Sequence, residues 1–92
     1  MYKFTLYIGS DNESKVLSLN EALTTVSEYF AGFNYSQLKG YWKGEKEDTL
    51  KVEVIGNEED KSRINAMVSK LKRVLKQDCI ILETAKHNIA FI

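Results

Sequence analysis

The residues of this chain that could perform chemistry are few, and their spacing does not bring them together. Cys79 and His87 are the only cysteine and the only histidine. A structural zinc site needs four thiolate or imidazole ligands, so these two residues cannot form one alone. A Cys–His nucleophile needs both side chains in contact, whereas an extended chain would separate the two positions by roughly 25 Å. The pattern therefore predicts no metal site, no cofactor and no thiol enzyme.

Two adjacent aromatic residues, Tyr41 and Trp42, could stack on a planar ligand or a nucleobase. The alternative, which we favour, is that Trp42 fills a seam between a strand and a helix. In that case Trp42→Ala should lower the free energy of unfolding by about 3–5 kcal/mol. Three oxygen donors in a row, Asp11, Asn12 and Glu13, lack the spacing of a calcium loop and are typical of a solvated turn.

Basic residues recur along 60–76, over the whole arc opposite an apolar helical stripe: Lys61, Arg63, Lys70, Lys72, Arg73 and Lys76. This spread indicates a solvated helix face more than an aimed phosphate-binding stripe. Near the end of the expected helix, Arg73 and Lys76 could contact an anion, either on an acidic partner or on a docked nucleotide.

Composition bounds the class of protein. The chain has 92 residues, which indicates one domain spanning 1–92. Thirteen Lys and Arg balance thirteen Asp and Glu, so no overall charge draws it to nucleic acid or to an anionic membrane. One cysteine excludes an intrachain disulfide and fits a reducing compartment. No apolar run approaches 18 residues and no signal peptide is evident, so we expect a cytoplasmic protein.

Strand patterns occur near the start, the middle and the end of the chain. Apolar residues alternate with polar ones over 2–8, which predicts a strand with one buried face. The central stretch 33–56 predicts two antiparallel strands joined by a charged turn at 43–48, a segment too long for a two-residue hairpin. Residues 79–84 predict a last strand, and 88–92 form a short apolar tail.

Helix signals separate these strands. Ser18 and Glu21 match a capping box, which predicts a helix over 19–31 with Gly32 as its C-terminal cap. Asn57 can cap a second helix with Asp60 at its third position. Acidic residues crowd the start of that helix and basic residues its end, which complements the helix dipole.

The resulting order, β-α-β-β-α-β, predicts an α+β domain of the ferredoxin-like type, with a possible extra strand at the C-terminus. In this fold an antiparallel sheet carries both helices on one face, and right-handed crossovers place the first and third strands in the middle.

The same alternation assigns residues to the sheet face that the helices leave open. Tyr7 and Ile55 should lie there, together with one of Tyr41 and Trp42. The run 79–82 adds either Cys79 and Ile81 or Ile80 and Leu82. An apolar patch on an open face usually means that a partner covers it. We therefore expect self-association, through this face or through exchange of the tail, or another protein partner.

Several short motifs resemble a family of small uncharacterised bacterial and phage proteins with this topology. They are a strand ending in Leu-Tyr-Ile-Gly at 6–9, a Gly-x-Trp at 40–42, and Lys-Gln-Asp-x-Ile at 76–80. Members of that family look like ferredoxin-like domains of unassigned activity. The resemblance thus implies a fold rather than a function.

Missing residues argue against several uses of this topology. RNA-recognition domains stack bases on aromatic residues of the third strand, and 50–56 contains none. The first loop lacks the arginine of acylphosphatase-like enzymes and the Cys-x-x-Cys of heavy-metal chaperones. Two classes remain, and we expect neither to be an enzyme. The first is a protein-interaction module, such as a phage or mobile-element accessory protein that inhibits or sequesters a host component. The second is a regulator that binds a nucleotide or metabolite between subunits.

Overall fold

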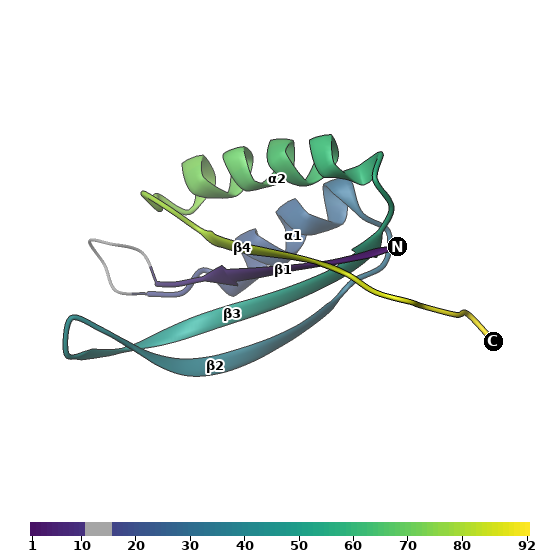
Figure 1. Cartoon of the computed structure of the whole chain (residues 1–92). Helices are drawn as coiled ribbons and strands as arrows, with labels where there is room; N and C mark the ends of the chain where they lie inside the picture. Colours follow the sequence, from purple (N-terminus) through teal and green to yellow (C-terminus); the bar gives the residue numbers. More distant parts are fainter. Residues whose placement is uncertain (11–15) are drawn as a thin grey trace.

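A computed structural model describes residues 1–10 and 16–92 and confirms the expected order of elements (Figure 1). The elements are β1 (Tyr2–Ile8), α1 (Leu19–Tyr29), β2 (Asn34–Trp42), β3 (Glu45–Gly56), α2 (Asp60–Val74) and β4 (Ile81–Lys86). Within the described residues, neither helix is long and apolar enough to cross a membrane.

The four strands form one antiparallel sheet in the order β2-β3-β1-β4, so the first and third strands are central, as predicted. Both helices lie on the same side of this sheet (Figure 1). Residues 87–92 follow β4 as a tail, and the His87 N–H still donates a hydrogen bond to the Met1 carbonyl at 2.9 Å. The ferredoxin-like α+β fold is therefore confirmed.

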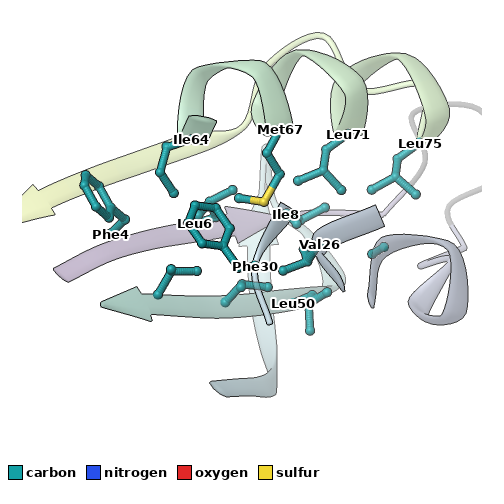
Figure 2. Packing of buried hydrophobic residues seen from close by; sticks show 13 residues of the cluster. Phe4, Leu6, Ile8, Val26, Phe30, Leu50, Ile64, Met67, Leu71 and Leu75 are labelled. Atoms are coloured by element: carbon teal, nitrogen blue, oxygen red, sulfur yellow. The ribbon is translucent and has the colours of Figure 1, made fainter. Parts of the chain in front are cut away.

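The core lies between the two central strands and the helices (Figure 2). The strands contribute alternate residues, because successive side chains of a strand point to opposite faces: Phe4, Leu6, Ile8, Leu50, Val52 and Val54. The helices contribute Ala22, Val26, Phe30, Ile64, Met67, Leu71 and Leu75. None of the residues of β2 belongs to this cluster. The edge strand β2 is therefore held mainly by its hydrogen bonds to β3.

The turn that leads into α2 shows the reciprocal hydrogen bonds that the sequence predicts, although the regular helix begins at Asp60 and Glu59, at its N-cap position, makes no capping bond with its side chain. The Asn57 side chain accepts a hydrogen bond from the Glu59 N–H at 3.2 Å, and the Asp60 carboxylate accepts one from the Asn57 N–H at 2.9 Å. At the other end, Lys76 adopts a left-handed φ of 55°, and the Gln77 N–H donates to the Lys72 carbonyl at 2.9 Å. This is a Schellman arrangement formed without glycine.

The boundaries of α1 differ from those expected. The Ser18 side chain makes no capping hydrogen bond, so the predicted capping box is not formed. The helix ends at Tyr29 rather than at residue 31, because Phe30 is extended and its side chain is buried in the core. Gly32 does not have the positive φ of a C-terminal cap.

The turn between β2 and β3 is also shorter than predicted. Lys43 and Gly44 both have positive φ, at 52° and 80°, which is the combination that type I′ hairpins require. Trp42 pairs directly with Glu45, so the turn contains two residues and the charged run 45–48 belongs to β3. The charged residues 45–48 can belong to a strand instead of a loop, because both faces of this part of the hairpin are exposed to water.

The last strand begins two residues later than predicted. Ile81 is its first residue, whereas Cys79 precedes the strand and is exposed, and Ile80 packs against the core before the strand begins. The four apolar residues at 79–82 therefore do not place two side chains on each face of the sheet. Only Ile81 and Leu82 lie within the strand, one on each face.

The cap of α2 provides a first test. Asn57→Ala removes the acceptor for the Glu59 N–H and should lower the free energy of unfolding by about 1 kcal/mol. Urea denaturation followed by circular dichroism measures this change. Asn88→Ala, in the tail, is the matched control and should leave the midpoint unchanged. Equal midpoints for both variants would contradict a stabilising cap.

Candidate functional site

The register of the sheet defines the face that the helices leave open. Residues 3, 5 and 7 of β1 point to this face, and their partners on the neighbouring strands point the same way: Lys51, Glu53 and Ile55 on β3, and Ile81, Glu83 and Ala85 on β4. The structure therefore places Tyr7, Ile55 and Ile81 on the open face, where the sequence predicts them. Their role in binding stays a prediction.

These apolar residues do not form the continuous patch that the sequence suggests. Tyr7 and Ile81 are direct partners at one end of the sheet. Ile55 lies opposite Lys3, at the other end. Mostly charged residues of β1, β3 and β4 lie between them. Cys79 and Ile80 precede β4 and add no apolar surface to this face. The open face is therefore mixed in character, with apolar residues at its two ends.

A shallow hollow of about 360 Å³ occupies the middle of the open face. Its lining combines acidic and basic residues with two hydroxyl-bearing ones: Lys3, Thr5, Tyr7, Lys51, Glu53, Glu83, Ala85 and His87. Thr5 is only 4% exposed although no helix covers this side. Long charged side chains on the flanking strands surround this residue. Sequence reasoning missed the hollow, because it combines residues from three strands.

One ion pair organises the charges of this hollow. Lys3 Nζ lies 2.5 Å from Glu53 Oε2, across the β1–β3 pairing. The hydrogen bond donated by Lys3 holds the pKa of the Glu53 carboxyl below its ordinary value. The same bond raises the pKa of Lys3. Both groups therefore stay charged near neutral pH, and the hollow presents fixed positive and negative charges to a ligand.

The aromatic pair at the end of β2 has a different environment from the one expected. Tyr41 is 72% exposed and Trp42 is 65% exposed. Trp42 is opposite Glu45 and shares the open-face side, whereas Tyr41 is opposite Lys46 on the side of the helices. Only Trp42 of the two is thus aligned with the open face. Its ring lies 5.9 Å from Lys43 Nζ and makes no seam with a helix, so our preferred interpretation of Trp42 was wrong.

The reason is that the hairpin extends past the helices. In Figure 1 the β2–β3 turn lies beyond the end of β1, away from α1 and α2. Along β2, only Gly40 is even partly shielded from solvent. Four of the exposed large apolar side chains in the described part of the chain lie on this strand: Tyr35, Leu38, Tyr41 and Trp42. They form the exposed apolar set of β2, an edge strand whose outer side pairs with none of the described strands.

The other candidate residues lie apart from both surfaces. Arg73 and Lys76 are exposed at the C-terminal end of α2, where they complement the negative end of the helix dipole. Contact with an anion there stays a prediction. Asp11, Asn12 and Glu13 lie outside the described residues. Across residues 1–10 and 16–92, no three His, Cys, Asp or Glu side chains are grouped so as to hold a metal ion.

A second hollow lies between the two helices. Its volume is about 330 Å³, and its walls include Glu21, Thr25 and Val74. Lys70 and Glu28 form an ion pair that links α2 to α1 at this place. This arrangement ties the helices together, and it does not connect with the open face of the sheet.

Comparison with known proteins adds information on the fold. No family model matches the chain, and no curated protein matches its sequence. Among solved structures, it is similar to a phage SAM lyase in its apo state, with a TM-score of 0.77 and 11% identity over 91% of this chain and 78% of that one.

Two further structures share the fold. A DUF3240 family protein from Shewanella baltica OS155 has a TM-score of 0.68 and 13% identity, over 99% of this chain and 94% of the other. The de novo designed protein Foldit4 has a TM-score of 0.62 and 15% identity, over 95% of this chain and 98% of the other. At these identities the likeness shows the fold alone. It agrees with the bacterial and phage resemblance in its general form.

The comparison with the phage lyase also corrects one expectation. The sequence led us to expect a protein that is not an enzyme, because it lacks the catalytic motifs of acylphosphatase-like proteins. A phage enzyme nevertheless has the same fold over most of this chain. The absence of those particular motifs is therefore no ground for excluding catalysis.

The exposure of Trp42 generates a second test, which reverses the sequence-based expectation. Trp42→Ala should change the free energy of unfolding by no more than about 0.5 kcal/mol, because an exposed side chain loses little packing. Leu6→Ala, at a fully buried position, should lower it by about 2–5 kcal/mol. Urea denaturation of both variants decides the matter. If Trp42→Ala instead lowered the free energy of unfolding by several kcal/mol, Trp42 would be packed between a strand and a helix after all.

Proposed function

We propose that this chain is a protein-binding module and that the β2–β3 hairpin is its binding surface. The observation that carries this proposal is the exposed apolar set of β2, which comprises Tyr35, Leu38, Tyr41 and Trp42. Tyr35 and Tyr41 lie on the side of the helices and Leu38 and Trp42 on the open-face side, so exposed apolar side chains flank the edge of this strand on both faces of the sheet. Exposed apolar surface of this kind favours an interaction site. Tyrosine and tryptophan are also enriched at the centres of protein–protein interfaces.

The backbone of β2 supports the same function. An edge strand presents unpaired N–H and C=O groups, which can pair with a strand of another chain. Natural edge strands usually carry protection such as proline, charged residues (lysine above all) or a bulge. β2 has no proline, and its pairing with β3 runs without interruption from Asn34 to Trp42. It carries one of these devices, Lys39, whose charge is paired with Asp48 of β3.

The finer parts of the proposal concern the biological setting. We place the chain among small phage and bacterial accessory proteins that act by inhibiting or sequestering another protein. The short motifs at 6–9, 40–42 and 76–80 support this grouping. The free and exposed thiol of Cys79 fits a protein that works in a reducing cytoplasm.

A second candidate function is binding of a small molecule that carries both charges. The hollow on the open face favours it, because Lys3 and Lys51 could pair with a carboxylate while Glu53 and Glu83 could pair with a cationic group. SAM has this combination of charges, with a sulfonium, an ammonium and a carboxylate. The phage SAM lyase of the same fold makes it the first ligand to test.

The hairpin proposal predicts that changing its exposed aromatic residues abolishes binding while leaving the stability of the fold nearly unchanged. The double variant Tyr41→Ser/Trp42→Ser should melt within a few degrees of wild type, because both side chains are exposed. It should fail to retain the proteins that immobilised wild type captures from the cells that naturally make this chain, as identified by mass spectrometry. Phe91→Ser, which removes an exposed aromatic side chain from the tail, is the matched control. Equal capture by wild type and the double variant would overturn the proposal.

The small-molecule candidate predicts a melting shift on addition of SAM, because a ligand that binds only the folded state raises the melting temperature. The shift should disappear in Glu83→Gln, which neutralises one wall of the hollow, and persist in Glu59→Gln, which lies at the start of α2. Chromatography of the same mixtures measures any consumption of SAM. A wild-type melting curve that millimolar SAM leaves unchanged would exclude this candidate.

A further inference from the structure

The geometry points to a second copy of this chain as the partner of β2, paired antiparallel with the same strand of its neighbour about Leu38. The two sheets would then join into one sheet of eight strands. This inference rests on the proposed protein-binding function of the hairpin and names the partner. It is carried by three independent features of β2, which are its free edge, the direction of its backbone groups and the order of its side chains.

The direction of the backbone groups follows from the turn. In an antiparallel pair, residues alternate between those that exchange hydrogen bonds with the partner and those that point away from it. A two-residue type I′ turn makes its flanking pair, Trp42 and Glu45, a hydrogen-bonded one. The even-numbered residues of β2 therefore bond to β3. The odd-numbered residues direct their N–H and C=O groups to the free edge: Tyr35, Gln37, Lys39 and Tyr41.

The other side of the sheet supports this alternation. The alternation can be followed through the registers of β3 with β1 and of β1 with β4. It then requires Met1 and His87 to be a hydrogen-bonded pair. The His87 N–H does donate to the Met1 carbonyl at 2.9 Å. The same alternation directs the Asp48 carbonyl toward β1, where the Ser10 hydroxyl donates to it at 3.2 Å.

These directions restrict how β2 can pair with its own copy. A free-edge residue must face another free-edge residue. Because the free-edge residues are all odd-numbered, the two residue numbers of every pair must add up to an even number. A sum of 76 is the only choice that pairs the whole strand, from Asn34 opposite Trp42 to Trp42 opposite Asn34. A sum of 78 shortens the pairing and sets Lys39 opposite Lys39 of the other copy. Like charges directly opposite each other are destabilising.

The order of the side chains fits the same register. On the side of the helices, Tyr35 of each copy is opposite Tyr41 of the other, which gives two aromatic pairs. Gln37 is opposite Lys39, so the only charged residue of β2 meets a neutral partner. On the open-face side, Leu38 is opposite Leu38, in a pair that is not hydrogen-bonded and therefore brings its side chains closest. Three of the four residues in the exposed apolar set thus gain an apolar partner.

A contact of this kind closes on itself. The two-fold axis passes between Leu38 of one copy and Leu38 of the other, perpendicular to the sheet, so the same surface serves both copies and neither β2 edge remains open. Both pairs of helices then lie on one face of the joined sheet, and the two open faces form one continuous surface. Because the contact uses each β2 edge once, it predicts a dimer, not a fibre.

The first test uses the direction of the backbone groups. Gln37→Pro removes an N–H that points to the free edge, so the variant should keep its hydrogen bonds to β3. Sedimentation should give a dimer for wild type, about twice 10.6 kDa, and at least a tenfold higher dissociation constant for Gln37→Pro. Gln37→Thr, which keeps the N–H, is the matched control and should dimerise like wild type. A far-ultraviolet circular dichroism spectrum like that of wild type shows that Gln37→Pro is folded.

The second test uses the two-fold axis and does not depend on proline. Leu38→Glu and Leu38→Lys each place like charges opposite each other, so each variant alone should be monomeric. An equal mixture places Glu opposite Lys and should form a mixed dimer, which native mass spectrometry identifies. Both substitutions are tolerated in the monomer, because Leu38 is exposed.

The outcomes separate this inference from the proposed function. A wild-type monomer, a trimer, or a dimer that none of these β2 variants affects would overturn pairing through β2. If the chain is monomeric but its hairpin still captures another protein, only the identity of the partner is wrong. If the chain is monomeric and the Tyr41→Ser/Trp42→Ser variant captures the same proteins as wild type, the proposed function fails as well.

Discussion

Two helices can cover only one face of a four-stranded sheet, and in this chain they do not cover the whole of that face. The central strands β1 and β3 direct alternate residues into the core beneath the helices, while β2 contributes none. Burial of apolar surface is the main source of folding free energy, at about 25 cal/mol per Å². The side chains of β2 therefore add little to the stability of the monomer. The interface proposed above would give their apolar character a role other than folding.

The two surfaces that the helices leave free suit different partners. The exposed apolar set of β2 offers aromatic surface and an unpaired backbone, which together favour strand addition by a protein. The hollow on the open face offers fixed charges around the Lys3–Glu53 pair, which favour orientation of a charged group. Exposed ion pairs contribute little affinity but help to select a partner. If β2 joins two copies, the two hollows lie on one surface of the joined sheet.

The fold is compatible with more than one function. Similar structures include a phage SAM lyase, a bacterial DUF3240 family protein and a de novo designed protein. The designed protein shows that a chain of this fold need not come from a natural family. Function therefore has to be argued from the side chains on the surface, as the same architecture supports many activities. For this chain the hairpin carries the stronger argument, because its exposed apolar residues have no role in the core.

Much of the fold was determined by residues close together in the sequence. Alternation over a few residues predicted β1, and the pair Asn57 and Asp60, three positions apart, predicted the cap of α2 that the structure confirms. The positions of Trp42 and Ile81 could be decided only by the tertiary structure. The sequence supplied a tryptophan on a strand, but its exposure depends on how far the hairpin extends past the helices. The four apolar residues at 79–82 likewise contain no signal for where pairing with β1 begins. Such features depend on contacts between segments distant in sequence, which local patterns do not encode.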